Sequence, residues 1–312
     1  MLLLDLAGPA EVLRRANVEQ DVVRFALRYV APSPSSHTSI GLSLAPLEPL
    51  PRTLADDATV LIVGSVEQVL PGAAQPSRAD DDAAEAAIVA WLRARVRPNH
   101  RLVTICSGAL LAGRAGLLDG RACTTHFSDC AELTALAPKA KVLENRLFVE
   151  DGPCLTSAGV TAGIDLMLHL VARTVGSEVA VAVARHLVVY LRRGGGDPQL
   201  SPWLEGRNHL HPVVHRVQDA VAADPAHPWT LDALAAVAGT STRHLSRLFN
   251  EHAAMSTTDY VNRLRMARAR ELLAGTRLDI ERVAEDAGFG SGRHLRRIWR
   301  RFNTTPPSGA RS

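Results

Sequence analysis

The residue with the clearest chemical potential is a cysteine at the end of a buried strand. An apolar run predicts a strand at Arg101–Ile105, and Cys106 follows it directly at the start of a helix-like stretch. A residue at such a turn projects above the sheet, and the positive end of the following helix lowers the pKa of a thiol. The pattern predicts a reactive thiol, although the single residue, taken alone, is better explained as a buried structural cysteine.

A second kind of chemistry belongs to two basic helices near the end of the sequence. Residues 243–249 (RHLSRLF) are echoed by residues 293–299 (RHLRRIW). Each follows a short apolar segment that ends in glycine, Leu231–Gly239 in the first copy and Ile280–Gly288 in the second. The copies are offset by 49 residues up to the glycine and by 50 after it. Helix, glycine-containing turn and second helix form a helix-turn-helix, so the sequence predicts two of them.

The second helix of each copy has one apolar face and one basic face. Leu245 and Phe249 share the apolar face in the first copy, and Leu295 and Trp299 share it in the second. The opposite face can meet phosphates and guanine edges. One such helix would be explained as a solvated basic surface, but two copies in matching register favour DNA contact. The candidate DNA-binding residues are Arg243, His244, Ser246, Arg247, Arg293, His294, Arg296 and Arg297.

Between the two copies, Thr257–Leu273 predicts one long helix, which would serve as a rigid spacer. With this spacer, residues 209–312 resemble the DNA-binding domain of the AraC/XylS family, and Ala287–Phe289 and Pro306 fit the same pattern. The resemblance implies an all-α domain with two helix-turn-helix units that binds double-stranded DNA.

The first 193 residues alternate between apolar strands and helices, which predicts a flavodoxin-like α/β sandwich with a mostly parallel sheet. A helix is expected to open at Asp5, with Pro9 in its first turn. Further helices are expected at 80–96, 106–112, 159–174 and 177–191, and strands at 22–31, 39–47, 59–64, 101–105, 122–125, 141–143, 147–150 and 154–156.

Four motifs in this region, at residues 106–109, 115–121, 124–126 and 156–165, resemble the PfpI-like (class I glutamine-amidotransferase-like) domain. They are most similar to the form that is fused to AraC-type tails in GlxA-type regulators, over about residues 4–190. The resemblance implies a pocket lined by Cys106, His126 and Glu11. In enzymes of this superfamily the cysteine is the nucleophile and the histidine its base, whereas in the regulators the pocket is thought to sense a small molecule.

Length and charge fit a two-domain chain. We assign residues 1–193 to a ligand-sensing and dimerisation domain, the Gly- and Pro-rich stretch 194–208 to a linker, and residues 209–312 to the DNA-binding domain. Residues 1–208 carry 20 basic and 22 acidic side chains, and residues 209–312 carry 15 and 10. The basic surplus therefore belongs to the part expected to meet nucleic acid.

Several classes are excluded by what the sequence lacks. No apolar run reaches membrane-spanning length, and the apolar stretch at Met1–Leu4 is too short for a signal peptide. Cys106, Cys123, Cys130 and Cys154 have neither metal-ligand nor disulfide spacing, so we expect free thiols in a cytoplasmic protein. We predict no metal and no other cofactor.

Three functions remain open. The first is a homodimeric transcription regulator whose N-terminal domain senses a small metabolite, with nitrogenous compounds as the candidates that the resemblance implies. The second is a cysteine hydrolase or amidase with a DNA-binding tail, and the third is an oligomerisation module with an empty pocket. We predict sensing rather than turnover, because Ser65 follows Gly64 where the superfamily commonly has a second glycine of an oxyanion site. Relatives would also have completed a first central strand before residue 5, so either the start lies upstream or the sheet exposes an edge.

Overall fold

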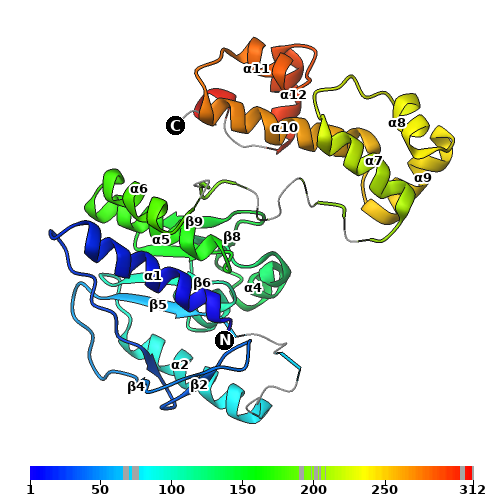
Figure 1. Cartoon of the computed structure of the whole chain (residues 1–312). Helices are drawn as coiled ribbons and strands as arrows, with labels where there is room; N and C mark the ends of the chain where they lie inside the picture. The colour runs from blue at the N-terminus through cyan, green and yellow to red at the C-terminus, as the bar shows by residue number, and fades with distance from the viewer. Residues whose placement is uncertain are drawn as a thin grey trace. The chain divides into compact units, whose positions relative to one another are not determined.

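The computed structural model divides the chain into two compact units, Met1–Gln199 and Leu200–Ser312 (Figure 1). This boundary falls inside the stretch 194–208 that we assigned to the linker. No helix in the described part of the chain is long and apolar enough to cross a membrane. The structure describes residues 1–65, 70–71, 77–189, 193–197, 199, 203, 205–207, 209–302 and 306–310.

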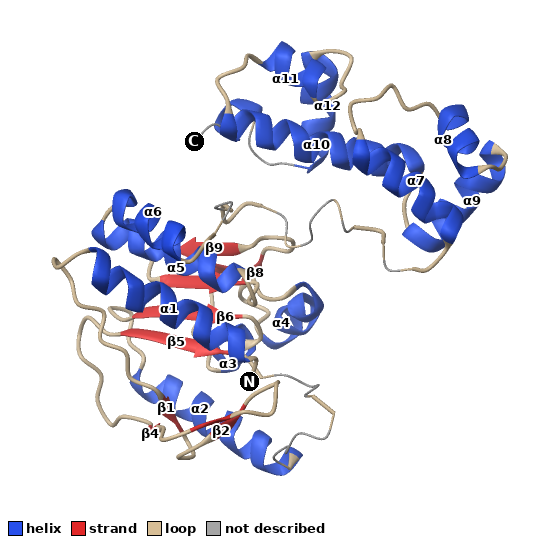
Figure 2. Ribbon diagram, viewed as in Figure 1, coloured by secondary structure: helices blue, strands red, loops and turns tan. Residues whose placement is uncertain are grey.

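The first unit is built on a four-stranded sheet with the order β5-β6-β10-β9 (Figure 2). β5 (Thr59–Val63), β6 (Arg101–Ile105) and β10 (Cys154–Ser157) are parallel, whereas β9 (Phe148–Asp151) is antiparallel to β10. The three parallel strands end at the same edge, and Cys106 lies there, immediately after β6. The predicted flavodoxin-like fold with a mostly parallel sheet is confirmed.

Helices cover both faces of this sheet (Figure 2). Alternate residues of β6 supply the two cores, because Val103 and Ile105 pack on one face and Leu102 on the other. A buried strand of this kind is apolar on both sides, as its sequence indicated. The helices on the first face are α1 (Leu3–Glu19), α5 (Ala162–Val175) and α6 (Ser177–His186), and those on the second are α2 (Arg78–Arg95), α3 (Gly108–Arg114) and α4 (Cys130–Leu136).

Short strand pairs replace the longer strands that we predicted at 22–31 and 39–47, so that prediction is wrong over most of both ranges. The side chain of Asn17 accepts a hydrogen bond from Phe25 N at 2.7 Å and donates one to Phe25 O at 2.8 Å. A helix side chain therefore satisfies this backbone in place of a neighbouring strand. The pairs there are β1 (Val30–Ala31) with β4 (Glu48–Pro49) and β2 (Ser36–His37) with β3 (Ser43–Leu44). A further short pair, β7 (Ala122–Cys123) with β8 (Lys141–Val142), lies within the strands that we predicted at 122–125 and 141–143.

The first helix also differs from the prediction in its start. α1 begins at Leu3, so Pro9 lies in its interior rather than in its first turn. A proline there removes the N–H that would bond to the carbonyl of Asp5. Pro9 is nevertheless buried, and Gly163 of α5 approaches it closely enough that an added Cβ would lie 3.4 Å from its ring.

The second unit contains the two predicted helix-turn-helix units. α8 (Leu231–Ala238) and α9 (Thr242–Ala253) form the first, and α11 (Ile280–Asp286) and α12 (Gly292–Phe302) form the second. The unit opens with α7 (Pro212–Ala223), and a 3-10 helix, η2 (Pro307–Ala310), follows α12.

A single long helix, α10 (Thr257–Gly275), joins the two helix-turn-helix units and belongs to both of their cores. Its first half contributes Tyr260 and Leu264 to the core around α7, α8 and α9. Its second half contributes Met266 and Leu273 to the core around α11 and α12. The predicted rigid spacer is therefore confirmed, and packing on both sides fixes it.

The turn of the second helix-turn-helix unit, between α11 and α12, has no room for a side chain at Gly288. Gly288 has a φ of 84°, and an added Cβ would lie 2.6 Å from Cα of Ala226. Its counterpart Gly239 has a φ of 66° and open space around it. We expect Gly288→Ala to lower the free energy of unfolding by about 2–4 kcal/mol, and Gly239→Ala by only about 1 kcal/mol. Urea denaturation of the full chain, followed by tryptophan fluorescence, measures both, and equal losses would contradict the packing argument.

Candidate functional site

Both candidate recognition helices bury the apolar face and expose the basic one. Leu245 and Phe249 of α9 and Leu295 of α12 are fully buried, and Trp299 of α12 is nearly so. The arginines on the opposite faces are exposed, and they are Arg243, Arg247, Arg293, Arg296, Arg297 and Arg300. The amphipathic pattern thus placed each side chain on the correct side of its helix.

The exposed arginines differ in how freely they can meet a ligand. Arg247 pairs with Glu251 at 2.9 Å, and Arg296 lies 3.7 Å from Glu281. Arg243 and Arg293, which occupy equivalent positions in the two copies, have no carboxylate partner within the residues that the structure describes. Arg297 and Arg300 also have none in that part of the chain, so these four guanidinium groups need to break no ion pair before contacting DNA. Among them, Arg243 and Arg293 form the pair at equivalent positions in the two copies.

The remaining candidates are less uniform. His244 is exposed and Ser246 is half-buried, and the cap residue Ser241 accepts a hydrogen bond from His244 N. His294 packs edge-on against Phe289, with ring centroids 5.5 Å apart. Burial, followed by the nearby charge of Arg297, lowers the pKa of the His294 imidazole. The lowered pKa favours the neutral imidazole, which lines a groove of about 280 Å³ together with Arg297 and the start of α10.

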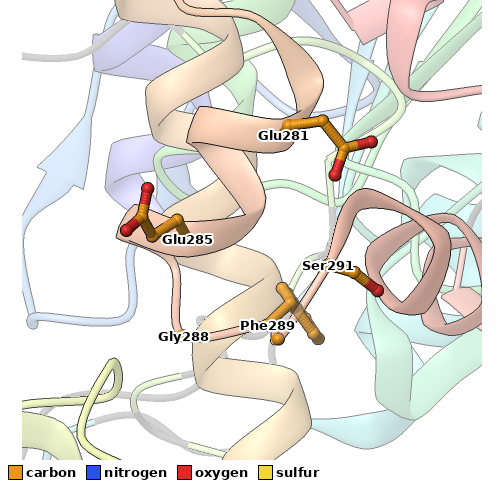
Figure 3. Close-up of a pocket in the computed structure, with 6 residues that line it drawn as sticks. Glu281, Glu285, Gly288, Phe289 and Ser291 are labelled. Carbon is orange, nitrogen blue, oxygen red and sulfur yellow. The ribbon is translucent and has the colours of Figure 1, made fainter.

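A second hollow of about 410 Å³ lies at the turn between α11 and α12 (Figure 3). Glu281 and Glu285 form its walls, with Gly288, Phe289 and Ser291 along the turn. Glu281 accepts a hydrogen bond from Gly292 N at 2.8 Å, so its carboxylate stabilises the beginning of α12. Because these walls are acidic, the hollow is unsuited to a DNA phosphate.

Arginines of α10 fix the position of one copy relative to the other. Arg265 donates to the carbonyls of Pro225 and His227 at 2.8 and 2.7 Å, and Arg268 donates to the carbonyl of Asp286 at 2.9 Å. The first pair of bonds ties α10 to the segment after α7, and the last ties it to the end of α11. The basic residues of this helix therefore have structural partners and differ from those of α9 and α12.

In the first unit, Cys106 lies at a tight junction of three segments. Its φ is 56°, which is uncommon for a residue with a side chain. An added Cβ on Gly159 would lie 2.2 Å from Cβ of Cys106, and one on Gly108 would lie 2.5 Å from the carbonyl oxygen of Ile62. Glycine is thus required at both places for the strand-to-helix turn to form, as we expected for Gly108.

The acid beside Cys106 is Asp5, which the sequence analysis missed as a site residue. Asp5 is fully buried, and its Oδ1 accepts a hydrogen bond from Val160 N at 2.6 Å. Burial raises the pKa of its carboxyl group, and the Val160 bond opposes that shift. Helical periodicity could have identified Asp5, because it belongs to the stripe of residues 5, 8, 9, 12, 13 and 16 that α1 buries.

The prediction of a lowered thiol pKa is wrong. Burial, and then the charge of Asp5, raise the pKa of Cys106 to about 12, although the backbone N–H of Ser107 opposes the shift. A thiol with this pKa stays protonated at neutral pH and is a weak nucleophile. Desolvation therefore outweighs the helix end on which the expectation relied.

The other two predicted pocket residues do not bond to the thiol. Glu11 is exposed on α1 and pairs with Arg14 at 2.7 Å. His126 precedes the 3-10 helix η1 (Phe127–Asp129), and its Nδ1 lies 2.7 Å from Ser128 Oγ. His126 does lie near enough to Asp5 to oppose the rise in its pKa. Ligand binding by Glu11, Cys106 and His126 stays a prediction. The acidic side chain that lies beside the Cys106 thiol is that of Asp5.

The charge on Asp5 yields a test of this arrangement. Asp5→Asn removes the charge but keeps an oxygen for Val160 N, so the pKa of Cys106 should fall. We expect alkylation of Cys106 by iodoacetamide at pH 9 to be roughly threefold to tenfold faster in this variant. Glu11→Gln, on an exposed part of the same helix, is the matched control and should react as the wild type does. Mass spectrometry of the Cys106 peptide follows the rate, and acceleration by Glu11→Gln instead would reverse the assignment.

Comparison with known proteins matches two separate parts of the chain to two families. Residues 1–173 match the DJ-1/PfpI family, and residues 234–312 match a helix-turn-helix domain. The HTH-type transcriptional regulator GbdR of Pseudomonas aeruginosa is 34% identical over 223 residues, which cover 72% of this chain and 60% of GbdR. The chain thus spans less than two thirds of that relative's length.

Two other relatives show the range of proteins that are similar to this chain. The HTH-type transcriptional regulator GlxA of Rhizobium meliloti is 32% identical over 218 residues, or 70% of this chain and 67% of GlxA. The isonitrile hydratase of Pseudomonas putida is 33% identical over 186 residues, or 59% of this chain and 72% of the hydratase. The chain therefore belongs to the DJ-1/PfpI family, and its DJ-1/PfpI domain is followed by an AraC-type helix-turn-helix domain.

Proposed function

We propose that the protein is a sequence-specific DNA-binding transcription regulator. The observation that carries the proposal is the pair of exposed guanidinium groups of Arg243 and Arg293, at equivalent positions on α9 and α12 and without a carboxylate partner in the described part of the chain. The names of its relatives GbdR and GlxA support the same function. As a regulator of this kind it would act in the cytoplasm.

The two recognition helices would enter successive major grooves of double-stranded DNA. Successive major grooves on one face of the duplex are roughly 34 Å apart, which is one helical turn of DNA. Arg243 and Arg293 would contact base edges, and His244, Ser246 and Arg247 would add contacts in the first groove. Arg296 and Arg297 would do so in the second groove, and His294 would position the helix there through its contact with Phe289.

The first unit would sense a small molecule at the Cys106 site. Asp5, Cys106 and His126 lie near one another at the carboxyl edge of the parallel strands, which is where parallel α/β folds bind ligands. Nothing in these residues selects one effector. The proposal includes pairing of the first units into a homodimer, so that the four recognition helices would protect an extended, repeated DNA site. Sedimentation of the full chain tests the pairing.

An enzymatic role for the first unit is the second candidate. The observation in its favour is the acid–thiol pair of Asp5 and Cys106, in a domain that is similar to an isonitrile hydratase. Against it, the pKa of about 12 leaves the Cys106 thiol protonated, and His126 bonds to Ser128 in the described structure. We therefore favour sensing over hydrolysis, hydration or amidase activity.

The DNA proposal predicts two different responses to substitution. Arg293→Ala should relax base preference at one position and cost about 1–3 kcal/mol of binding free energy. Arg300→Glu, at an exposed position near the end of the same helix, should weaken binding to all sequences alike and reduce the salt dependence. Binding to selected and random duplexes at several salt concentrations separates the two. An equal loss on both duplexes for Arg293→Ala would show only a phosphate contact.

The sensing proposal predicts that Cys106→Ser changes the response to an effector and little else. DNA affinity without effector should stay at the wild-type value, and the free energy of unfolding should change by about 1 kcal/mol or less. Screening small amines and amino acids for thermal stabilisation of the full chain supplies the effector for the test. If the wild type turns over small amides, esters or isonitriles and Cys106→Ser abolishes that turnover, the enzymatic candidate replaces this one.

A further inference from the structure

The last described residues of the first unit are bound to it rather than free. We call residues 193–197 and 199 the strap. Leu147 N donates hydrogen bonds to the carbonyls of Gly195 and Asp197, both at 3.1 Å. Gly195 also packs without spare room, because an added Cβ would lie 2.6 Å from the carbonyl oxygen of Phe148. Part of the stretch that we assigned to the linker is therefore docked beside β9.

The first end of the strap is attached to a loop that touches Cys106. Arg193 donates to Asp165 Oδ2 from Nε at 3.0 Å and to Thr161 Oγ1 from Nη2 at 2.9 Å. Thr161 closes the loop of residues 159–161, in which Val160 N bonds to Asp5 and Gly159 lies against Cys106. Because Asp165 is only 5% exposed, the position of Arg193 is held by a buried charge.

The second end of the strap reaches Cys106 from the other side. Gln199 Nε2 donates to the carbonyl of Thr125 at 2.7 Å, and Thr125 Oγ1 donates to the carbonyl of Cys106 at 2.9 Å. Gln199 N is also held by Asn145 Oδ1 at 2.9 Å. The Oε1 atom of Gln199, however, is buried without a hydrogen-bond partner in the described part of the chain. A buried acceptor without a partner costs free energy, so this end is docked but incompletely satisfied.

We propose that the strap is a clamp controlled by the Cys106 site: an occupant of that site shifts the loops at 159–161 and at Thr125, and the strap undocks. Both of its ends are attached to segments that touch Cys106, and docking is the state in which Gln199 Oε1 lacks a partner. By reciprocity, undocking the strap must also alter the environment of Cys106. The step from undocking to gene regulation rests on the proposed function, whereas the coupling itself does not.

Undocking would change how the DNA-binding unit is tethered. Release of the strap frees the chain between residue 193 and residue 199, which is seven residues long by the sequence, and each residue spans up to roughly 3.5 Å when extended. The tether would thus lengthen by up to about 25 Å. A longer tether changes the effective concentration at which a second DNA-binding unit in the same assembly finds its site.

The first experiment uses the wild-type full chain and occupies the site chemically. Methyl methanethiosulfonate, at alkaline pH, adds an S-methylthio group to Cys106, and mass spectrometry confirms the position. Hydrogen exchange should then be about tenfold faster at the amide of Leu147, which donates to the strap. Cys106→Ser treated in the same way is the control and should show no change. Unchanged exchange at Leu147 in the modified wild type would overturn the proposal.

The second experiment runs in the opposite direction with a pair of glycine variants. Gly195→Ala should force the strap away from Phe148, whereas Gly196→Ala is its matched control because a Cβ there meets nothing within 4 Å. Gly195→Ala should change the alkylation rate of Cys106 by about threefold or more, and Gly196→Ala should not. If Gly195→Ala frees the Leu147 amide but leaves the Cys106 rate at the wild-type value, the strap is only a packing element. If Gly195→Ala does not fold, the chemical modification of the wild type decides.

Neither experiment contains DNA, so the clamp and the proposed function fail separately. A chain that shows the coupling but binds no specific duplex would refute the regulator and leave the clamp standing. A chain that binds specific DNA and shows no coupling would refute the clamp alone.

Discussion

Three backbone segments meet at Cys106 with almost no space between them, and the geometry of the first unit depends on that contact. The ends of β5 and β6 approach so closely that an added Cβ on Gly64 would lie 2.1 Å from Ser107 Oγ. Gly159 reaches the same point from the end of β10, and Cys106 takes a positive φ to fit between them. Gly64 and Gly159 therefore allow the ends of β5, β6 and β10 to converge on the Cys106 thiol.

Burial at this point also decides the chemistry. A cysteine nucleophile at a strand-to-helix turn needs the thiolate, but desolvation and the neighbouring carboxyl group of Asp5 favour the neutral thiol of Cys106. The same two groups, kept neutral or singly charged in a tight site, are suited to recognising a molecule by shape and hydrogen bonding. One fold can thus hold an enzyme or a sensor, and the burial of the Cys106 sulfur favours the sensing role that we propose.

Sequence patterns predicted most of the architecture because strong periodicity reports burial directly. β6 was predicted with its observed bounds because Leu102, Val103 and Ile105 make residues 101–105 a short, mostly apolar segment. The faces of α9 and α12 followed from helical spacing. The predictions failed where a distant partner decides the outcome. Residues 22–29 look like a strand, but the Asn17 side chain bonds to both backbone groups of Phe25, and the Gln20 side chain bonds to Val22 and Val23. Transfer by motif did not point to Asp5, which lies six positions before Glu11 on α1 and so faces about 120° away from it, and the role of Glu11 stays a prediction. The raised thiol pKa could not be read from the sequence, because it depends on three segments packing together.

The sharing of α10 between two cores places a constraint on how this domain can change during evolution. One additional residue between Leu264 and Met266 would advance the second helix-turn-helix unit by only about 1.5 Å, but it would rotate it by about 100° around the helix axis. α12 would then face away from the duplex that we propose α9 contacts. Insertions and deletions in α10 are consequently tolerable only in whole helical turns, so the spacing of the two half-sites can diverge in steps of one turn but not gradually.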